Sequence, residues 1–127
     1  MVNGVVRYVT GEGHASFARV RVLGFSGQSV EYDAIIDTGF SGSVAILPED
    51  VVTLGLLPSG SVETILADGS VRTVLTYSAA VEWDGIQIIS EVIADDEVPL
   101  IGMEILTGYN LSIDVVDGGA VRITRLP

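Results

Sequence analysis

Hydrophobic and polar residues alternate along most of the chain, as in strands that bury one face and expose the other. Runs of this kind predict strands near residues 4–10, 15–25, 30–37, 61–67, 70–83, 86–94, 109–115 and 120–126. Turn sequences separate several of them, with Ser-Gly-Gln at 26–28 and Asp-Gly at 68–69, 84–85 and 117–118. No repeat or linker interrupts the 127 residues, so the sequence predicts one all-β domain spanning 1–127.

Two stretches have helical features instead. "PEDVVTLGL" places Pro48 at a first helical position, acids in the first turn and Gly55 as a stop. "IGMEILTG" is a shorter candidate that ends at Gly108. The expected fold is therefore all-β with one or two short helices.

Composition narrows the classes of partner. The chain has 17 acidic residues against 6 Lys and Arg, a net charge of −11, which would repel the phosphates of a nucleic acid. Hydrophobic residues make up 48% of the chain, so part of the surface is expected to be buried against a partner. No apolar run approaches the ~18 residues of a membrane span, and the N-terminus lacks the pattern of a signal peptide. Cysteine is absent, which fits a reducing compartment, and we expect a cytoplasmic protein.

Several of the acidic residues have structural explanations. The cluster "DDE" at 95–97 lacks the spaced oxygen ligands of a calcium loop, so we expect a solvated loop and no metal. His14 is expected to be a solvated turn residue, which argues against a serine hydrolase pairing it with Ser41. Three aspartates directly precede glycine between predicted strands, and hairpin turns account for them: Asp68, Asp84 and Asp117.

Asp37 is different, because it ends the apolar run of "AIIDTGFSGS" at 34–43. A carboxylate at the end of a buried strand costs free energy unless something compensates it. One interpretation is an Asx-turn in which the carboxylate binds amides of its own loop. A second apolar run, "PLIGMEIL" at 99–106, is also broken by a glycine. Gly39 and Gly102 would allow the two segments to cross closely beneath the Asp37 loop.

These segments carry a resemblance to a known family. "IIDTGFSGS" resembles the active-site loop of the retropepsin-like aspartic proteases, and "LIGMEIL" resembles their apolar-apolar-Gly segment with the helix that follows. "ETILADGSVRTV" lies where that family has its flap, a hairpin that folds over the substrate. Order and spacing agree from about residue 15 to the C-terminus, and "DTGFSGSVAILP" is most similar to the small prokaryotic members.

The resemblance implies a fold, an activity and a partner. The fold would be the closed acid-protease barrel, and the activity hydrolysis of peptide bonds in peptides or proteins without a cofactor. The chain has one Asp-Thr-Gly, so it would be half of a homodimer in which Asp37 of each subunit forms a dyad. Two carboxylates in contact share a proton, an arrangement for which aspartic proteases are a standard example. By the same resemblance Thr38 would hydrogen-bond across the dimer, and Gly39 would let the backbone reach the substrate.

The resemblance also assigns the residues around the dyad. Leu100, Ile101 and Gly102 would support the active-site loop. Many pepsin-like loops have serine where this chain has Phe40, and the turn at 67–69 lacks the tyrosine of pepsin flaps. These departures concern substrate preference more than chemistry. The terminal strands would form the dimer interface. A non-catalytic dimeric module for peptide binding or assembly stays open as the alternative. The expected substrate contacts are Phe40, Ser41, Ile65, Leu66, Ala67, Asp68 and Gly69.

Overall fold

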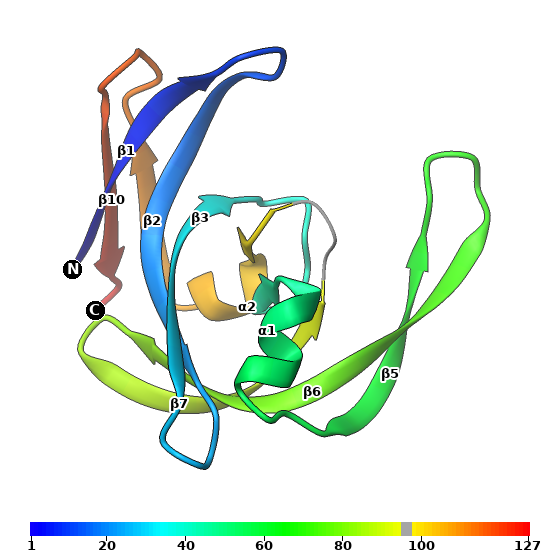
Figure 1. The fold of residues 1–127 in the computed structure, drawn as a ribbon. Helices are drawn as coiled ribbons and strands as arrows, with labels where there is room; N and C mark the ends of the chain where they lie inside the picture. Colours follow the sequence, from blue (N-terminus) through cyan, green and yellow to red (C-terminus); the bar gives the residue numbers. More distant parts are fainter. Residues whose placement is uncertain (95–97) are drawn as a thin grey trace.

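The computed structural model describes residues 1–94 and 98–127, and the acidic cluster at 95–97 lies outside the described residues. Strands dominate the described part, with two short helices between them (Figure 1). The all-β class predicted from the alternation of hydrophobic and polar residues is therefore confirmed. Among the same residues, no helix has the length and apolar character needed to cross a membrane.

Eight strands lie where the sequence pattern predicts them: β1 (Val2–Val9), β2 (Gly13–Leu23), β3 (Ser29–Ile36), β5 (Pro58–Ile65), β6 (Val71–Trp83), β7 (Ile86–Ala94), β9 (Tyr109–Ile113) and β10 (Ala120–Arg125). Both predicted helices are present, as α1 (Pro48–Thr53) and α2 (Met103–Leu106). Two strands were not predicted, β4 (Val44–Ile46) and β8 (Leu100–Ile101). Each is too short for alternation to be recognised along the chain.

The strands form one sheet in the order β5-β6-β7-β4-β8-β3-β2-β1-β10-β9. An additional pairing joins β2 to β6, so the strands from β6 to β2 in this order are connected in a ring. Most pairs are antiparallel, but β8 runs parallel to β3, and β4 runs parallel to β7. The two short strands therefore link β7 to β3 within the ring.

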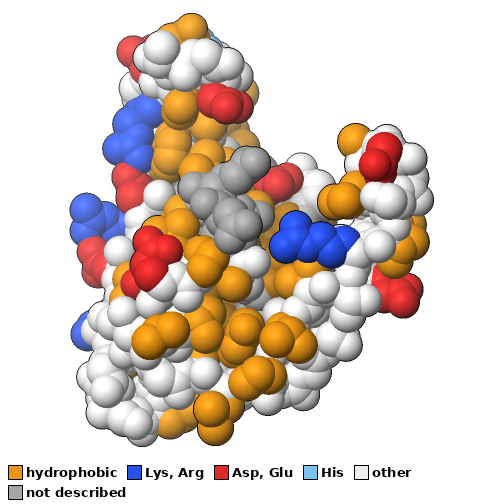
Figure 2. All heavy atoms as spheres, turned by 45° about the vertical axis from the view of Figure 1, so that its right-hand side comes forward, with side chains coloured by type: hydrophobic (Ala, Val, Ile, Leu, Met, Phe, Trp, Pro, Cys, Tyr) orange, Lys and Arg blue, Asp and Glu red, His pale blue; other side chains and the backbone are white. Residues whose placement is uncertain are grey.

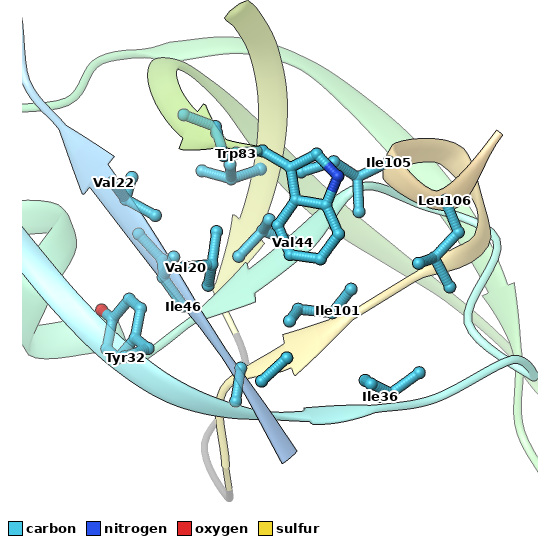
Figure 3. Packing of buried hydrophobic residues seen from close by; sticks show 14 of the residues in the cluster. Val20, Val22, Tyr32, Ile36, Val44, Ile46, Trp83, Ile101, Ile105 and Leu106 are labelled. Carbon is cyan, nitrogen blue, oxygen red and sulfur yellow. The ribbon is translucent and has the colours of Figure 1, made fainter. Parts of the chain in front are cut away.

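The core lies inside this ring. Val22, Val44, Ile46 and Ile101 are fully buried, and they come from strands that are far apart in sequence. Figure 3 shows these side chains gathered with Trp83 beside Ile105 of α2. Burial of apolar side chains from both short strands and their neighbours supplies the main stabilisation of the middle of the sheet.

Helix α1 is attached to β3 by a tyrosine. The buried Tyr32 hydroxyl donates a hydrogen bond to the Asp50 carboxylate and accepts one of 3.4 Å from the Leu47 amide. Burial, together with the hydrogen bond to Asp50, raises the pKa of Tyr32 above its usual range. The tyrosine therefore remains neutral and holds the helix in place.

Two parts of the sheet project from this core (Figure 1). On one side, β1 and β10 pair with each other and each has a second neighbour, β2 and β9 respectively. The predicted interface strands therefore have no free edge, and β9 is the edge strand on this side. On the other side, the β5–β6 hairpin extends away from the core, with β5 as the second edge.

Two residues assigned to turns have further roles. His14 is exposed but belongs to β2, where it pairs with Tyr8 and packs edge-on against its ring at 5.5 Å. Asp84 has φ 52° in the β6–β7 turn, as predicted, and it also binds the Met1 ammonium, the Tyr109 hydroxyl and Arg125. The hydrogen bond from the Met1 ammonium, followed by that from Tyr109 and the charge of Arg125, lowers the pKa of Asp84.

Candidate active site

Asp37 is the first residue after β3 and is half-buried. Strand β3 ends beside β8, with Ile35 opposite Leu100 and Ile36 opposite Ile101. The Asp37 amide continues this ladder by donating to the Ile101 carbonyl at 2.9 Å. The backbone of Asp37 is therefore held by the apolar run at 99–106, which the sequence analysis predicted to lie close to the Asp37 loop.

The two segments cross closely at Gly102, as predicted. The Gly102 amide donates to the Ser43 carbonyl at 2.8 Å, and the Met103 amide donates to the Phe40 carbonyl at 2.8 Å. A Cβ atom at Gly102 would lie 2.1 Å from the Gly42 carbonyl oxygen, closer than any side chain permits. Glycine is therefore required at 102. Gly39 does not take part in the crossing, since a Cβ there would approach only the Asp37 carboxylate.

The Asp37 carboxylate has one partner in its own loop. The Gly39 amide donates to Oδ1 at 2.8 Å, and the Phe40 amide donates to the Asp37 carbonyl at 3.1 Å. This is the Asx-turn that the structural interpretation predicted. It accounts for one oxygen only, because Oδ2 accepts no hydrogen bond from residues 1–94 or 98–127. Thr38, next in the loop, is exposed.

A groove of about 520 Å³ lies beside this loop. We name residues 39–43 the loop wall and residues 62–65 the hairpin wall, because these two stretches face each other across the groove. Figure 2 shows the hairpin as an arm that stands apart from the body of the molecule, with apolar and acidic side chains at its end. Further lining comes from β6, β7 and α2, through Thr76, Glu91, Ile93 and Glu104.

Hydrogen bonds join the two sides at the base of the groove. The Ser43 hydroxyl donates to the Glu91 carbonyl and accepts from the Ser90 hydroxyl, both at 2.8 Å. The hydroxyls of Ser59 and Thr76 lie 3.1 and 3.4 Å from Glu91 Oε1 and donate to it. Ser43 and Thr76 are buried, so these bonds satisfy polar groups that water does not reach. The base of the groove is therefore a connected polar layer.

The ring of Phe40 covers the crossing of the two segments. A Cβ atom at either Gly42 or Gly102 would come within 2.6 Å of a carbon of this ring. Phe40 also lines the groove, together with Ser41. One part of the Phe40 ring thus packs against Gly42 and Gly102, and the rest of its surface faces the groove.

The residues predicted from the sequence divide into three groups. Gly39, Phe40, Ser41 and Ile65 line the groove. Leu100, Ile101 and Gly102 lie behind the loop and support it through the bonds described above. The third group lies outside the lining of the groove and comprises the half-buried Asp37 and the exposed Thr38, Leu66, Ala67, Asp68 and Gly69.

Asp68 acts as a turn residue at the end of the hairpin. Its Oδ1 accepts from the Ser70 amide at 2.9 Å, and Gly69 has φ +83°. Hydrogen bonds from the Ser70 hydroxyl and amide lower the pKa of Asp68. The turn predicted by Asp-Gly at 68–69 is confirmed.

Sequence reasoning missed much of the lining, namely Gly42, Ser43, Val62, Glu63, Thr64, Thr76, Ile93, Glu91 and Glu104. The alternation identifies their strands but does not indicate that β5, β6 and β7 face the Asp37 loop. Thr76 and Glu91 are polar, but both strands contain other polar residues, so these two positions indicate no site in the sequence.

A second hollow of about 500 Å³ is lined by residues of β2, β3, β6 and β7. Its charged side chains are all paired, Arg19 with Glu31, Arg21 with Glu82, and Asp84 with Arg125 outside the hollow. This hollow therefore presents fewer unpaired charged side chains than the groove beside Asp37.

Comparison with known proteins assigns no function to the groove or to the second hollow. No family model, curated protein or solved structure matches the chain.

Proposed function

We propose that the chain is one half of an aspartic endopeptidase, in which Asp37 from each of two subunits activates water for attack on a peptide bond. The observation that carries the proposal is the setting of Asp37. Its backbone is held by the Gly102 segment, one carboxylate oxygen is oriented by the Gly39 amide, and the lining of a groove begins two residues later, at Gly39. Held geometry of this kind is what acid–base chemistry requires.

The topology supports the same proposal. The ring of paired strands from β6 to β2 agrees with the closed barrel of the retropepsin-like proteases. The apolar-apolar-Gly segment runs beside the Asp-Thr-Gly loop and is followed by a short helix, α2, as that family requires. The hairpin wall lies across the groove from the loop, where a flap would act.

The chemistry needs a second carboxylate, and a second copy of the chain would supply it. One Asp37 would accept a proton from water while the protonated Asp37 of the other subunit would donate to the carbonyl oxygen of the substrate. Asp37 Oδ2 accepts no hydrogen bond within residues 1–94 and 98–127, which suits this role. Exposed Thr38 is within reach of a partner on the same side.

The subunits would meet on the side of the loop rather than through the edges of β1 and β10. Those two strands already have neighbours on both sides, so only their faces are available to a partner. Strand β9 has a free edge and is the alternative contact. The exposed Met103, which follows Gly102, adds apolar surface near the loop.

The second candidate is a dimeric module that binds peptides in the groove without cleaving them. The groove supports it equally well, and the hydrogen bond from Gly39 to Asp37 would then be purely structural. Hydrolysis that depends on Asp37 separates the two functions.

The test is cleavage of a peptide library by the purified protein and by its Asp37→Asn variant. Asparagine keeps the size and the acceptor oxygen for Gly39 but does not act as a base, so we expect loss of cleavage with the fold intact. Excess variant mixed into wild type should also inhibit, through dimers with one aspartate. Cleavage by Asp37→Asn at the wild-type rate, or a fully active monomer in sedimentation, would overturn the proposal.

A further inference from the structure

We propose that the groove selects peptide segments that carry lysine or arginine, with Glu91 as the principal determinant of that choice. The inference rests on the proposed function only in taking the groove as the place where a peptide binds. Its argument comes from the charges, the apolar surface and the hydrogen bonds of the lining residues.

Three carboxylates from three different elements line the groove: Glu63 of β5, Glu91 of β7 and Glu104 of α2. No arginine is among the described residues that line it, and the chain has no lysine at all. The described lining residues therefore carry charge of one sign only, and they would attract a cationic side chain and repel an acidic one.

The arginines of the chain do not offset the charge of the groove. Elsewhere, arginines neutralise acids on the surface, in the pairs Arg7–Asp33, Arg19–Glu31, Arg21–Glu82, Arg122–Asp114 and Arg125–Asp84. Within residues 1–94 and 98–127, none of the three groove glutamates has such a partner. The five pairs thus use five of the six arginines away from the groove, and the sixth, Arg72, lies opposite Thr64 on the hairpin but is not among the lining residues.

Glu91 is the most rigidly held of the three. Its Oε1 accepts from the Ser59 and Thr76 hydroxyls at 3.1 and 3.4 Å, and Thr76 is buried. Its Oε2 accepts no hydrogen bond from the described residues and is available to a ligand. A carboxylate that is already oriented loses less conformational entropy when a cation binds.

Apolar residues beside these charges fit the rest of such a side chain. Val62 and Ile65 from the hairpin wall and Ile93 from β7 line the same groove. Lysine and arginine have long aliphatic stems that pack on apolar surface while the charged end reaches a carboxylate. The lining therefore suits both parts of a basic side chain.

The experiment uses the Asp37→Asn protein, so that binding is measured without cleavage. The affinities of two fluorescent peptides are compared by anisotropy. The peptides differ at one position only, where one has arginine and the other has citrulline, the neutral isostere of arginine. We expect the arginine peptide to bind roughly fivefold more tightly. The difference should shrink as ionic strength rises from about 0.05 M to about 0.5 M.

The matched pair of variants is Glu91→Gln and Glu12→Gln in the same background. Both remove one charge, but Glu12 is exposed between β1 and β2 and does not line the groove. Glu91→Gln should lose most of the preference for arginine, and Glu12→Gln should retain it. Equal binding of the two peptides, equal effects of the two variants, or no peptide binding at all would overturn the inference.

The outcomes also separate this inference from the proposed function. Cleavage by wild type with no preference for basic residues would retain the endopeptidase and refute the selection. A charge-dependent preference in binding, without any cleavage by wild type, would retain the selection and favour the non-catalytic module.

Discussion

The two walls of the groove are built in opposite ways. The loop wall is held by backbone hydrogen bonds to the Gly102 segment and ends in Ser43, which is 1% exposed. The hairpin wall belongs to a two-stranded arm, because β6 pairs only with β5 from Val71 to Leu75. Apolar side chains of this arm face solvent, with Ile65 of the wall 78% exposed and Leu75 of β6 50% exposed.

This difference indicates a division of roles. Reacting groups must be held within a narrow range of positions, and the dense bonding of the loop wall provides that. A two-stranded hairpin with few buried contacts is marginally stable by itself and opens easily. Such an element suits substrate entry and closure over a bound peptide. The predictions below measure how far the two walls differ.

The largest loss of stability is expected from Gly102→Ala. The new Cβ would collide with the Gly42 carbonyl and with the ring of Phe40, so the crossing must separate. We expect the free energy of unfolding to fall by about 3 kcal/mol, and any activity to be lost with it. Thermal and denaturant unfolding measure this loss.

Gly60→Ala is the matched control on the hairpin side. A Cβ atom at Gly60 would lie 3.3 Å from the Thr76 hydroxyl and 3.8 Å from Glu91 Oε1, both of which are side-chain atoms. We expect a change within about 1 kcal/mol, since these side chains adjust and alanine restricts the unfolded chain. Equal losses in the two variants would contradict the difference between the walls.

The long strands were predictable because their alternation extends over many residues, whereas β4 and β8 have only three and two residues. Those two short strands determine the topology, since β8 pairs with both β3 and β4 and so connects the halves of the sheet. Local pattern does not contain this long-range pairing. Asp84 shows a similar limit: its turn was evident from Asp-Gly, but its bonds to Tyr109 and Arg125 depend on the fold.

The site divides in the same way. Asp37 and Gly102 were identifiable because each interrupts an apolar run, an anomaly visible in the sequence. Glu91, Thr76 and Ile93 line the groove only because β6 and β7 pass beneath the loop wall. The sequence therefore indicated the candidate chemistry, while the surface that would contact a substrate required the structure.

An intermediate effect is expected from Ser43→Ala at the base of the groove. The change removes the bond to the Glu91 carbonyl and the acceptor of the Ser90 hydroxyl. Loss of a buried hydroxyl with two partners should cost about 1–2 kcal/mol. Hydrogen exchange should increase in both β4 and β7, because the bond joins them. Ser112→Ala, at an exposed position in β9, is the control and should change stability little; an equal loss there would argue against the polar layer.

The smallest effect on stability is expected from Ile65→Ser on the hairpin wall. Ile65 is 78% exposed, so its replacement should change the free energy of unfolding by less than about 0.5 kcal/mol. Closure of the hairpin over a peptide would bury part of this side chain. Its loss should then weaken peptide binding by about 0.7 kcal/mol, a roughly threefold rise in Kd.

The control for Ile65→Ser is Val115→Ser, which alters a side chain of similar exposure, 71%, that does not line the groove. Both variants should unfold at nearly the wild-type temperature, since neither side chain contributes much buried surface. Only Ile65→Ser should weaken the binding of a peptide, measured by anisotropy in the Asp37→Asn background. If the two variants bind peptide equally well, the hairpin does not close over the peptide, and the hairpin wall belongs to an ordinary exposed hairpin.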